Sequence, residues 1–134
     1  MNPQSEDLKD ILVNAGVGTF AATSGWGIYI SKEPASPDTV ITLYDTGGSA
    51  PEYLLDGTDM FRPNLQVRVR GEPGGYMEAW SKAKEVVDAV ARLEPQTING
   101  TFYAGVWQQT DIAILQYDDN DRPILTVNFR IRRY

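Results

Sequence analysis

The stretch LQVRVRGEPGGYMEAWSKAKEVVDAVARLE, residues 65–94, decides the fold because its apolar periodicity changes at a turn. Up to residue 70, apolar and polar side chains alternate, the period-two pattern of a strand with one buried face. Pro73-Gly74-Gly75 then breaks the strand, since proline lacks a backbone donor and glycine tolerates unusual dihedral angles. From Tyr76 the apolar residues recur at helical spacing, and Pro95 stands just past the expected helix end. The stretch therefore predicts a strand, a tight turn and one long amphipathic helix.

The two faces of this helix differ in character. The charged face includes Glu78 and Lys82, which are spaced to form an ion pair. The apolar face is expected to pack on a sheet, and it comprises Trp80, Ala83, Val87 and Val90.

The remainder of the chain predicts a second helix and further strands. Ser5 is a suitable N-cap for a short first helix, which Gly16 and Gly18 would end. Asn99-Gly100 is a turn dipeptide. Strand patterns cover residues 26–32 and 39–45, expected as a hairpin, and then residues 101–108, 111–117 and 124–134. The prediction is an α+β fold in the order α-β-β-β-α-β-β-β, with about five to six strands in a mostly antiparallel or mixed sheet flanked by the two helices.

Composition limits the classes of function. A chain of 134 residues is the usual size of a single domain, here residues 1–134. The formal net charge of −6 argues against a dedicated DNA-binding surface, which needs clustered basic residues. The absence of cysteine and histidine excludes zinc sites built on those residues, thiol chemistry and Ser-His triads. No signal-peptide pattern and no apolar run of membrane-spanning length is visible, so no membrane partner is expected.

Residues 46–63, TGGSAPEYLLDGTDMFRP, form a long segment without clear periodicity. We expect a long loop here, and loops of this length in compact domains tend to be functional or mobile. A fully solvated loop would not carry Tyr53, Leu54, Leu55, Met60 and Phe61. Either these side chains fold back over the core, or some of them dock on another protein chain, where aromatic residues and methionine are favoured.

A second candidate interface is basic. If the strand that begins at Leu65 pairs with the last strand, their polar faces would align arginines on an otherwise acidic protein. Such a face is either simply solvated or meets acidic groups of a neighbouring subunit. The arginines concerned are Arg68, Arg70, Arg130 and Arg132.

No catalytic, cofactor or metal site is predicted. The aspartates of residues 118–121 lack the downstream glycine and glutamate of a calcium loop and suit a polar hairpin turn better. Other carboxylates lie in turns or on a solvated helix face, which accounts for them without catalysis. The chain is therefore not expected to be an enzyme.

Three runs of sequence carry a resemblance to a known family: YDTGGSAPEY (44–53), RPNLQVRVRGEPGGYMEAWSKAKEVVDAV (62–90) and DDNDRPILTVNFRIRRY (118–134). They resemble the minor capsid proteins of tailed bacteriophages, small proteins akin to tail terminator or tail completion proteins. The likeness extends from about Leu8 to the last residue with the elements in the same order, and none of its motifs is a catalytic signature.

The resemblance implies a subunit of a ring, commonly hexameric, that caps the head-proximal end of the tail tube and provides the surface that joins tail to head. Its expected partners are further copies of itself, the tail tube protein and a head completion or connector protein. DNA would pass through the lumen without specific binding, and the expected location is the tail of the virion, after assembly in the host cytoplasm. The alternatives are a head completion or neck protein and, from a different class, a small ligand-binding or enzymatic α+β domain.

Overall fold

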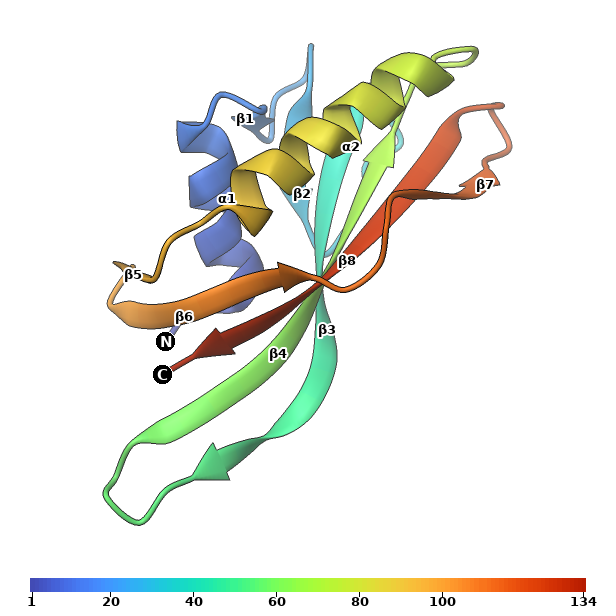
Figure 1. The fold of residues 1–134 in the computed structure, drawn as a ribbon. Helices are drawn as coiled ribbons and strands as arrows, with labels where there is room; N and C mark the ends of the chain where they lie inside the picture. The colour runs from blue at the N-terminus through green and yellow to red at the C-terminus, as the bar shows by residue number, and fades with distance from the viewer.

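The computed structural model describes all residues, 1–134, as two helices and a curled sheet (Figure 1). The first half of the chain forms α1 (Gln4–Asn14), β1 (Thr19–Phe20), β2 (Gly27–Ile30), β3 (Val40–Tyr53) and β4 (Asp59–Arg70). The second half forms α2 (Tyr76–Ala91), β5 (Gln96–Ile98), β6 (Thr101–Gln108), β7 (Ala113–Tyr117) and β8 (Pro123–Arg133).

The strands form one mixed sheet in the order β1-β2-β3-β4-β8-β6-β5, and β7 pairs with the first part of β8. Both helices lie on the same side of this sheet (Figure 1). The predicted α+β class with a mixed sheet is therefore confirmed. The sheet has eight strands, more than the five to six expected, because the short strands β1 and β5 gave no pattern in the sequence.

The strand and helix that opened the sequence analysis form as predicted. Leu65, Val67 and Val69 of β4 are buried beneath the helices, and β4 pairs antiparallel with β8. The Asn99-Gly100 dipeptide forms the β5–β6 turn with both residues at positive φ. The core combines the buried face of α2 with residues of α1 and of the sheet, among them the alternate residues of β8, namely Leu125, Val127, Phe129 and Ile131.

One residue of the predicted helix face is misplaced. The buried residues of α2 are Ala79, Ala83, Val86, Val87 and Val90. Trp80 is 38% exposed, because it lies roughly 100° around the helix from Ala79 and thus at the margin of the buried stripe. Lys82 also forms its ion pair with a different residue from the one predicted. Its Nζ lies 2.9 Å from a carboxylate oxygen of Glu85 and pairs with this residue instead of Glu78.

The start of α1 differs from the prediction as well. Pro3 occupies the N-cap position, and Ser5 lies inside the helix with no capping hydrogen bond from its own side chain. Asp45 of β3 takes over this task, accepting the Ser5 backbone N–H at 2.9 Å and the Ser5 hydroxyl at 2.7 Å. The C-terminal end of α1 is as predicted, because Gly16 at φ +74° ends the helix.

The predicted hairpin between residues 26–32 and 39–45 is wrong, because β2 and β3 are parallel. Parallel pairing requires the chain to return to the same end of the sheet, and residues 31–39 make this return. Arg70 holds the returning segment with hydrogen bonds to the carbonyl oxygens of Pro37 and Asp38. Arg122 donates to the carbonyl oxygen of Ala35.

The predicted long loop at residues 46–63 is also wrong. Most of this segment is strand, because β3 continues to Tyr53 and β4 begins at Asp59. Together they form an antiparallel arm that projects beyond the body of the protein (Figure 1). Two register shifts, between Thr46 and Ser49 and between Ser49 and Glu52, interrupt the alternation of side chains, so the strand gave no period in the sequence.

Neither helix is long and apolar enough to cross a membrane.

Candidate functional site

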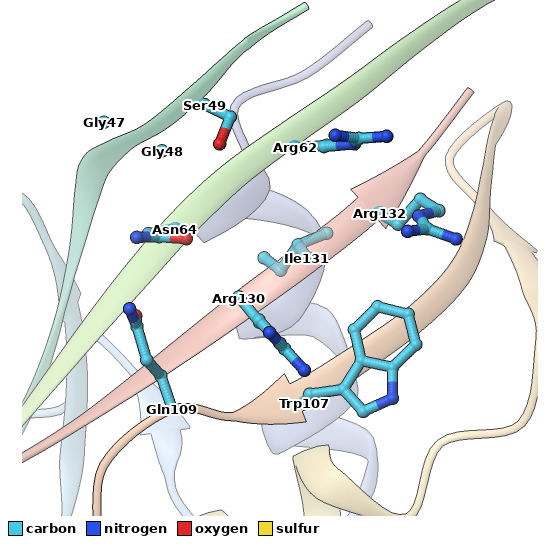
Figure 2. A pocket seen from close by; sticks show the side chains of 10 residues that line it. All are labelled: Gly47, Gly48, Ser49, Arg62, Asn64, Trp107, Gln109, Arg130, Ile131 and Arg132. Atoms are coloured by element: carbon cyan, nitrogen blue, oxygen red, sulfur yellow. The ribbon is translucent and has the colours of Figure 1, made fainter.

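A polar groove of about 500 Å³ lies where the arm joins the helix-free face of the sheet (Figure 2). Strands β3, β4, β6 and β8 all contribute to its lining. The lining residues are Gly47, Gly48, Ser49, Arg62, Asn64, Trp107, Gln109, Arg130, Ile131 and Arg132. Three guanidinium groups and no carboxylate face this space, so the groove suits an anionic group.

The register of β6, β8 and β4 brings the cationic and aromatic side chains together. Trp107 is paired with Arg130 across β6 and β8, and Arg130 is paired with Asn64 across β8 and β4. The guanidinium carbons of Arg130 and Arg132 lie 5.7 Å and 5.8 Å from the centre of the Trp107 ring, within cation–π distance. Figure 2 shows Trp107 next to Arg130 and Arg132, with Arg62 on β4 opposite.

The Trp107 ring packs against Gly105. A Cβ atom built on Gly105 would lie 2.4 Å from the indole ring, which no real contact tolerates. The absence of a side chain at Gly105 therefore lets the ring lie against β6, where it is still 41% exposed.

The arginines of the groove differ in how their charge is compensated. Arg62 forms an ion pair with Glu52 of the arm at 3.1 Å. Arg130 and Arg132 have no carboxylate within ion-pair distance, and both are exposed. The groove thus presents two uncompensated positive charges on an acidic protein.

The four arginines predicted as one basic ladder separate into three environments. Arg130 and Arg132 reach the groove. Arg68 is paired in register with Thr126, four positions along β4 from Asn64, and its guanidinium lies 4.9 Å from the centre of the Tyr44 ring. Arg70 is not available to a partner at all, because it is buried in an ion pair with Glu33 at 2.7 Å.

Arg62 and Trp107 are the groove residues that the sequence analysis missed. Arg62 continues the alternating series of β4 beyond Asn64, but Pro63 hides this continuation. Trp107 was placed in a strand by its alternation, yet nothing in the sequence indicated that β6 would pair with β8.

The apolar residues of the arm differ in their exposure to solvent. Tyr53 is 72% exposed, and Leu54 and Leu55 are exposed beside it in the turn. Met60 is only 8% exposed, and Phe61 is half-buried. Of the predicted set, Tyr53 and Leu54 are therefore accessible to a partner, while Met60 is already buried within the chain.

A second cluster of polar residues is buried, and most of its polar atoms are hydrogen-bonded within the chain. Asp7 accepts hydrogen bonds from the Tyr103 hydroxyl and from Asn99, the latter at 2.8 Å. Arg133 donates to the Tyr103 oxygen at 3.0 Å and to the carbonyl oxygen of Asn2 at 2.8 Å. Burial, and then the hydrogen bond to Asp7, raise the pKa of the Tyr103 phenol well above its ordinary value of 10. This cluster ties the N-terminal segment and α1 to β6 and β8, while the Arg133 Nε is buried without a hydrogen-bond partner.

The aspartate turn between β7 and β8 is held by its own hydrogen bonds. Asp118 accepts the backbone N–H groups of Asn120 and Arg122, both at 3.0 Å, and its other oxygen lies 2.8 Å from the Arg122 Nε. No group of three or more potential metal-ligating side chains occurs in the structure.

Comparison with known proteins gives a family and a fold. Residues 11–134 match the family described as "Bacteriophage tail terminator protein". No curated protein sequence matches the chain. Among solved structures, a chain of the "Virion of native gene transfer agent (GTA) particle" superimposes with a TM-score of 0.67, at 14% identity over 96% of this chain and 92% of that one.

A second solved structure superimposes with a TM-score of 0.55, at 15% identity over 80% of this chain and 78% of the other. At such identities the structural likeness establishes the fold, and the family match, which spans nearly the whole chain, establishes the membership. The protein belongs to the bacteriophage tail terminator family and is a structural component of the phage tail.

Proposed function

We propose that this chain closes into a ring, with six subunits as the commonest number in proteins of this kind, on the head-proximal end of the tail tube. The ring stops growth of the tube and presents the surface to which the head attaches. The tail tube protein lies on one face of the ring, a head completion or connector protein lies on the other, and DNA passes through the lumen.

The observation that carries this proposal is the arm formed by β3 and β4. A two-stranded ribbon in water has little stability of its own, and this one ends in exposed Tyr53, Leu54 and Leu55. Exposed apolar groups of this size, on an element that projects from the body, are typical of surfaces that are covered on assembly.

The charge distribution supports the same role. The net charge of −6 disfavours adhesion of DNA to the chain, which suits a channel through which DNA must slide. The groove is lined by arginine, amide and hydroxyl groups with no carboxylate or other general base among them, which favours binding over catalysis. We therefore assign the chain a structural and not an enzymatic task.

The test is complementation of a phage that lacks this gene. With the protein absent, we expect tails of variable and excessive length that carry no heads, as seen by negative-stain electron microscopy. Supplying the native chain restores uniform tails joined to heads. Supplying Leu55→Asp, a change at a fully exposed residue that leaves the core intact, gives overlong or unjoined tails.

The same experiment separates the proposal from its nearest alternative. A head completion or neck protein acts on heads, so its loss would leave tails of normal length beside tailless heads. Uniform tails in the absence of this chain would therefore contradict the proposal.

A further inference from the structure

We infer that the arginine groove of one subunit binds the acidic tip of the β3–β4 arm, residues 53–59, of the next copy in the ring. The inference rests on the proposed ring and names the contact that closes it. It concerns two different surfaces of the same chain, the arrangement that a head-to-tail ring requires.

The groove lacks a counter-charge of its own. Arg130 and Arg132 lie outside every ion pair of the chain, whereas Arg62, Arg70, Arg92, Arg122 and Arg133 all have a carboxylate partner. The two unpaired guanidinium groups lie next to the Trp107 ring at one side of the groove (Figure 2). Arginine and tryptophan are the side chains most enriched where binding energy concentrates at interfaces.

The tip of the arm carries the complementary chemistry. Asp56 and Asp59 have no cation within ion-pair distance, and Asp56 bonds only to the backbone N–H of Thr58, at 2.9 Å. Tyr53, Leu54 and Leu55 stand exposed beside these carboxylates. The tip thus offers carboxylates for the guanidinium groups and apolar surface for the indole ring.

The tip of the arm cannot bind the groove of its own chain. Ser49 lines the groove, and Leu55 is six positions further along the arm, which places the tip at most roughly 20 Å away at about 3.3 Å per residue. Folding the tip back would break the β3–β4 pairing. The contact is therefore possible only between copies.

A second copy fits the groove better than a nucleic acid does. Nucleic-acid affinity grows with the number of phosphates neutralised, and this face has only three arginines without a carboxylate partner on a chain of net charge −6. Trp107 adds an apolar surface that matches Leu54 and Leu55. In a duplex the faces of the bases are covered by their neighbours, so the phosphate backbone that it exposes offers no apolar surface to Trp107.

The experiment uses the lack of native cysteine in the chain. Thr58→Cys in the tip and Gln109→Cys in the groove, both at exposed uncharged residues, are combined in one chain, and the variant is supplied to the phage that lacks the gene. Tails are isolated and treated with a short bismaleimide cross-linker. We expect a ladder of cross-linked species up to the closed ring on a denaturing gel. Each subunit then carries one cysteine in its tip and one in its groove, so it can be linked to both of its neighbours.

The controls test whether the ladder reports the proposed contact. Either cysteine alone should give no ladder, because a head-to-tail contact brings no two identical residues together. Thr58→Cys combined with Glu78→Cys, on the exposed side of α2 and outside the groove, should also give none. Normal tails that yield no ladder with Thr58→Cys and Gln109→Cys would overturn the inference and leave the proposed function standing.

A charge exchange gives a second readout that does not depend on cross-linking. Asp56→Arg with Asp59→Arg should abolish head joining, and so should Arg130→Glu with Arg132→Glu. The four changes together should restore it at least tenfold over either pair. Absence of recovery in a variant that melts like the native chain would count against the contact, as would binding of a DNA duplex that is lost with Arg130→Glu and Arg132→Glu.

Discussion

Tyr103 of β6 is buried and forms a hydrogen bond with Asp7 of α1. Its burial, and then this hydrogen bond, make the stability of the protein sensitive to alkaline pH. The fold raises the pKa of the Tyr103 phenol above its unfolded value of 10. A group whose pKa is raised by folding contributes its full stability below the unfolded pKa and loses it as the pH rises toward the folded pKa. We therefore expect the free energy of unfolding, measured in urea, to fall from pH 10 upward.

Tyr103→Phe is the matched control for this pH dependence. It removes the titrating group, so the decline above pH 10 should become shallower than in the native chain. At neutral pH the variant should be less stable by about 1.5–3 kcal/mol, because Asp7 loses a hydrogen bond to its charged form. Identical pH profiles for the two proteins would show that Tyr103 is not the responsible group.

Arg68 and Arg70 are two residues apart on β4, yet we expect their loss to have very different effects. Arg70→Ala leaves Glu33 without its buried partner and frees two carbonyl oxygens of the returning segment, so it should cost about 3–5 kcal/mol. Arg68→Ala removes a half-buried cation–π contact with Tyr44 and should cost less than about 1 kcal/mol. Thermal melts of the two variants measure this difference. Equal losses of stability would show that the ion pair of Arg70 does not stabilise the fold.

At the scale of elements, the bend of the arm depends on a glycine. A Cβ atom on Gly48 would lie 2.0 Å from the carbonyl oxygen of Arg62, a backbone atom that cannot move freely, whereas a Cβ on Gly47 would meet nothing within 4 Å. We expect Gly48→Ala to destabilise the chain by about 1–3 kcal/mol through overpacking at the bulge. Gly47→Ala should be neutral or slightly stabilising. A Gly48→Ala variant as stable in urea as Gly47→Ala would mean that the bulge relaxes without cost.

The elements that could be predicted from the sequence are those with an uninterrupted period. The last strand alternates without a break from Leu125 to Ile131, and α2 keeps its apolar stripe from Ala79 to Val90, so both were placed correctly. The arm was not predicted because its bulges shift the alternation twice. In addition, proline is unusual inside a strand, so the strand was predicted to begin after Pro63, whereas β4 runs from Asp59 to Arg70.

The candidate groove was predictable only in part for a related reason. Arg130 and Arg132 follow from the alternation of one strand. Arg62 and Trp107 belong to the same site only because β4 and β6 pair with opposite edges of β8, and such long-range pairing leaves no local signal. The burial of Arg70 likewise depends on the distant segment at residues 31–39.

At the scale of the whole molecule, charge is separated between two places that cannot meet within one chain. The helix-free face holds the unpaired Arg68, Arg130 and Arg132, and the tip of the arm holds the unpaired Asp56 and Asp59. The apolar residues of the tip lie beside its carboxylates. Assembly can therefore draw on both electrostatic attraction and apolar burial, and the two respond to salt in opposite ways.

The response of assembly to salt shows whether electrostatic attraction or apolar burial dominates the contact. The range of electrostatic interactions falls from about 10 Å at 0.1 M to about 3 Å at 1 M salt, so a contact led by Arg130 and Arg132 should weaken as sodium chloride is raised. We expect the assembled fraction, measured by analytical ultracentrifugation of the concentrated protein, to fall between these limits.

Arg130→Gln with Arg132→Gln should give an assembled fraction that is low and insensitive to salt, because the charges that salt screens are then absent. Leu55→Ala should lower assembly while leaving the salt dependence intact, since it removes apolar area and no charge. Assembly of the native chain that strengthens with salt would instead assign the contact to Tyr53, Leu54 and Leu55, because apolar burial does not weaken as ionic strength rises.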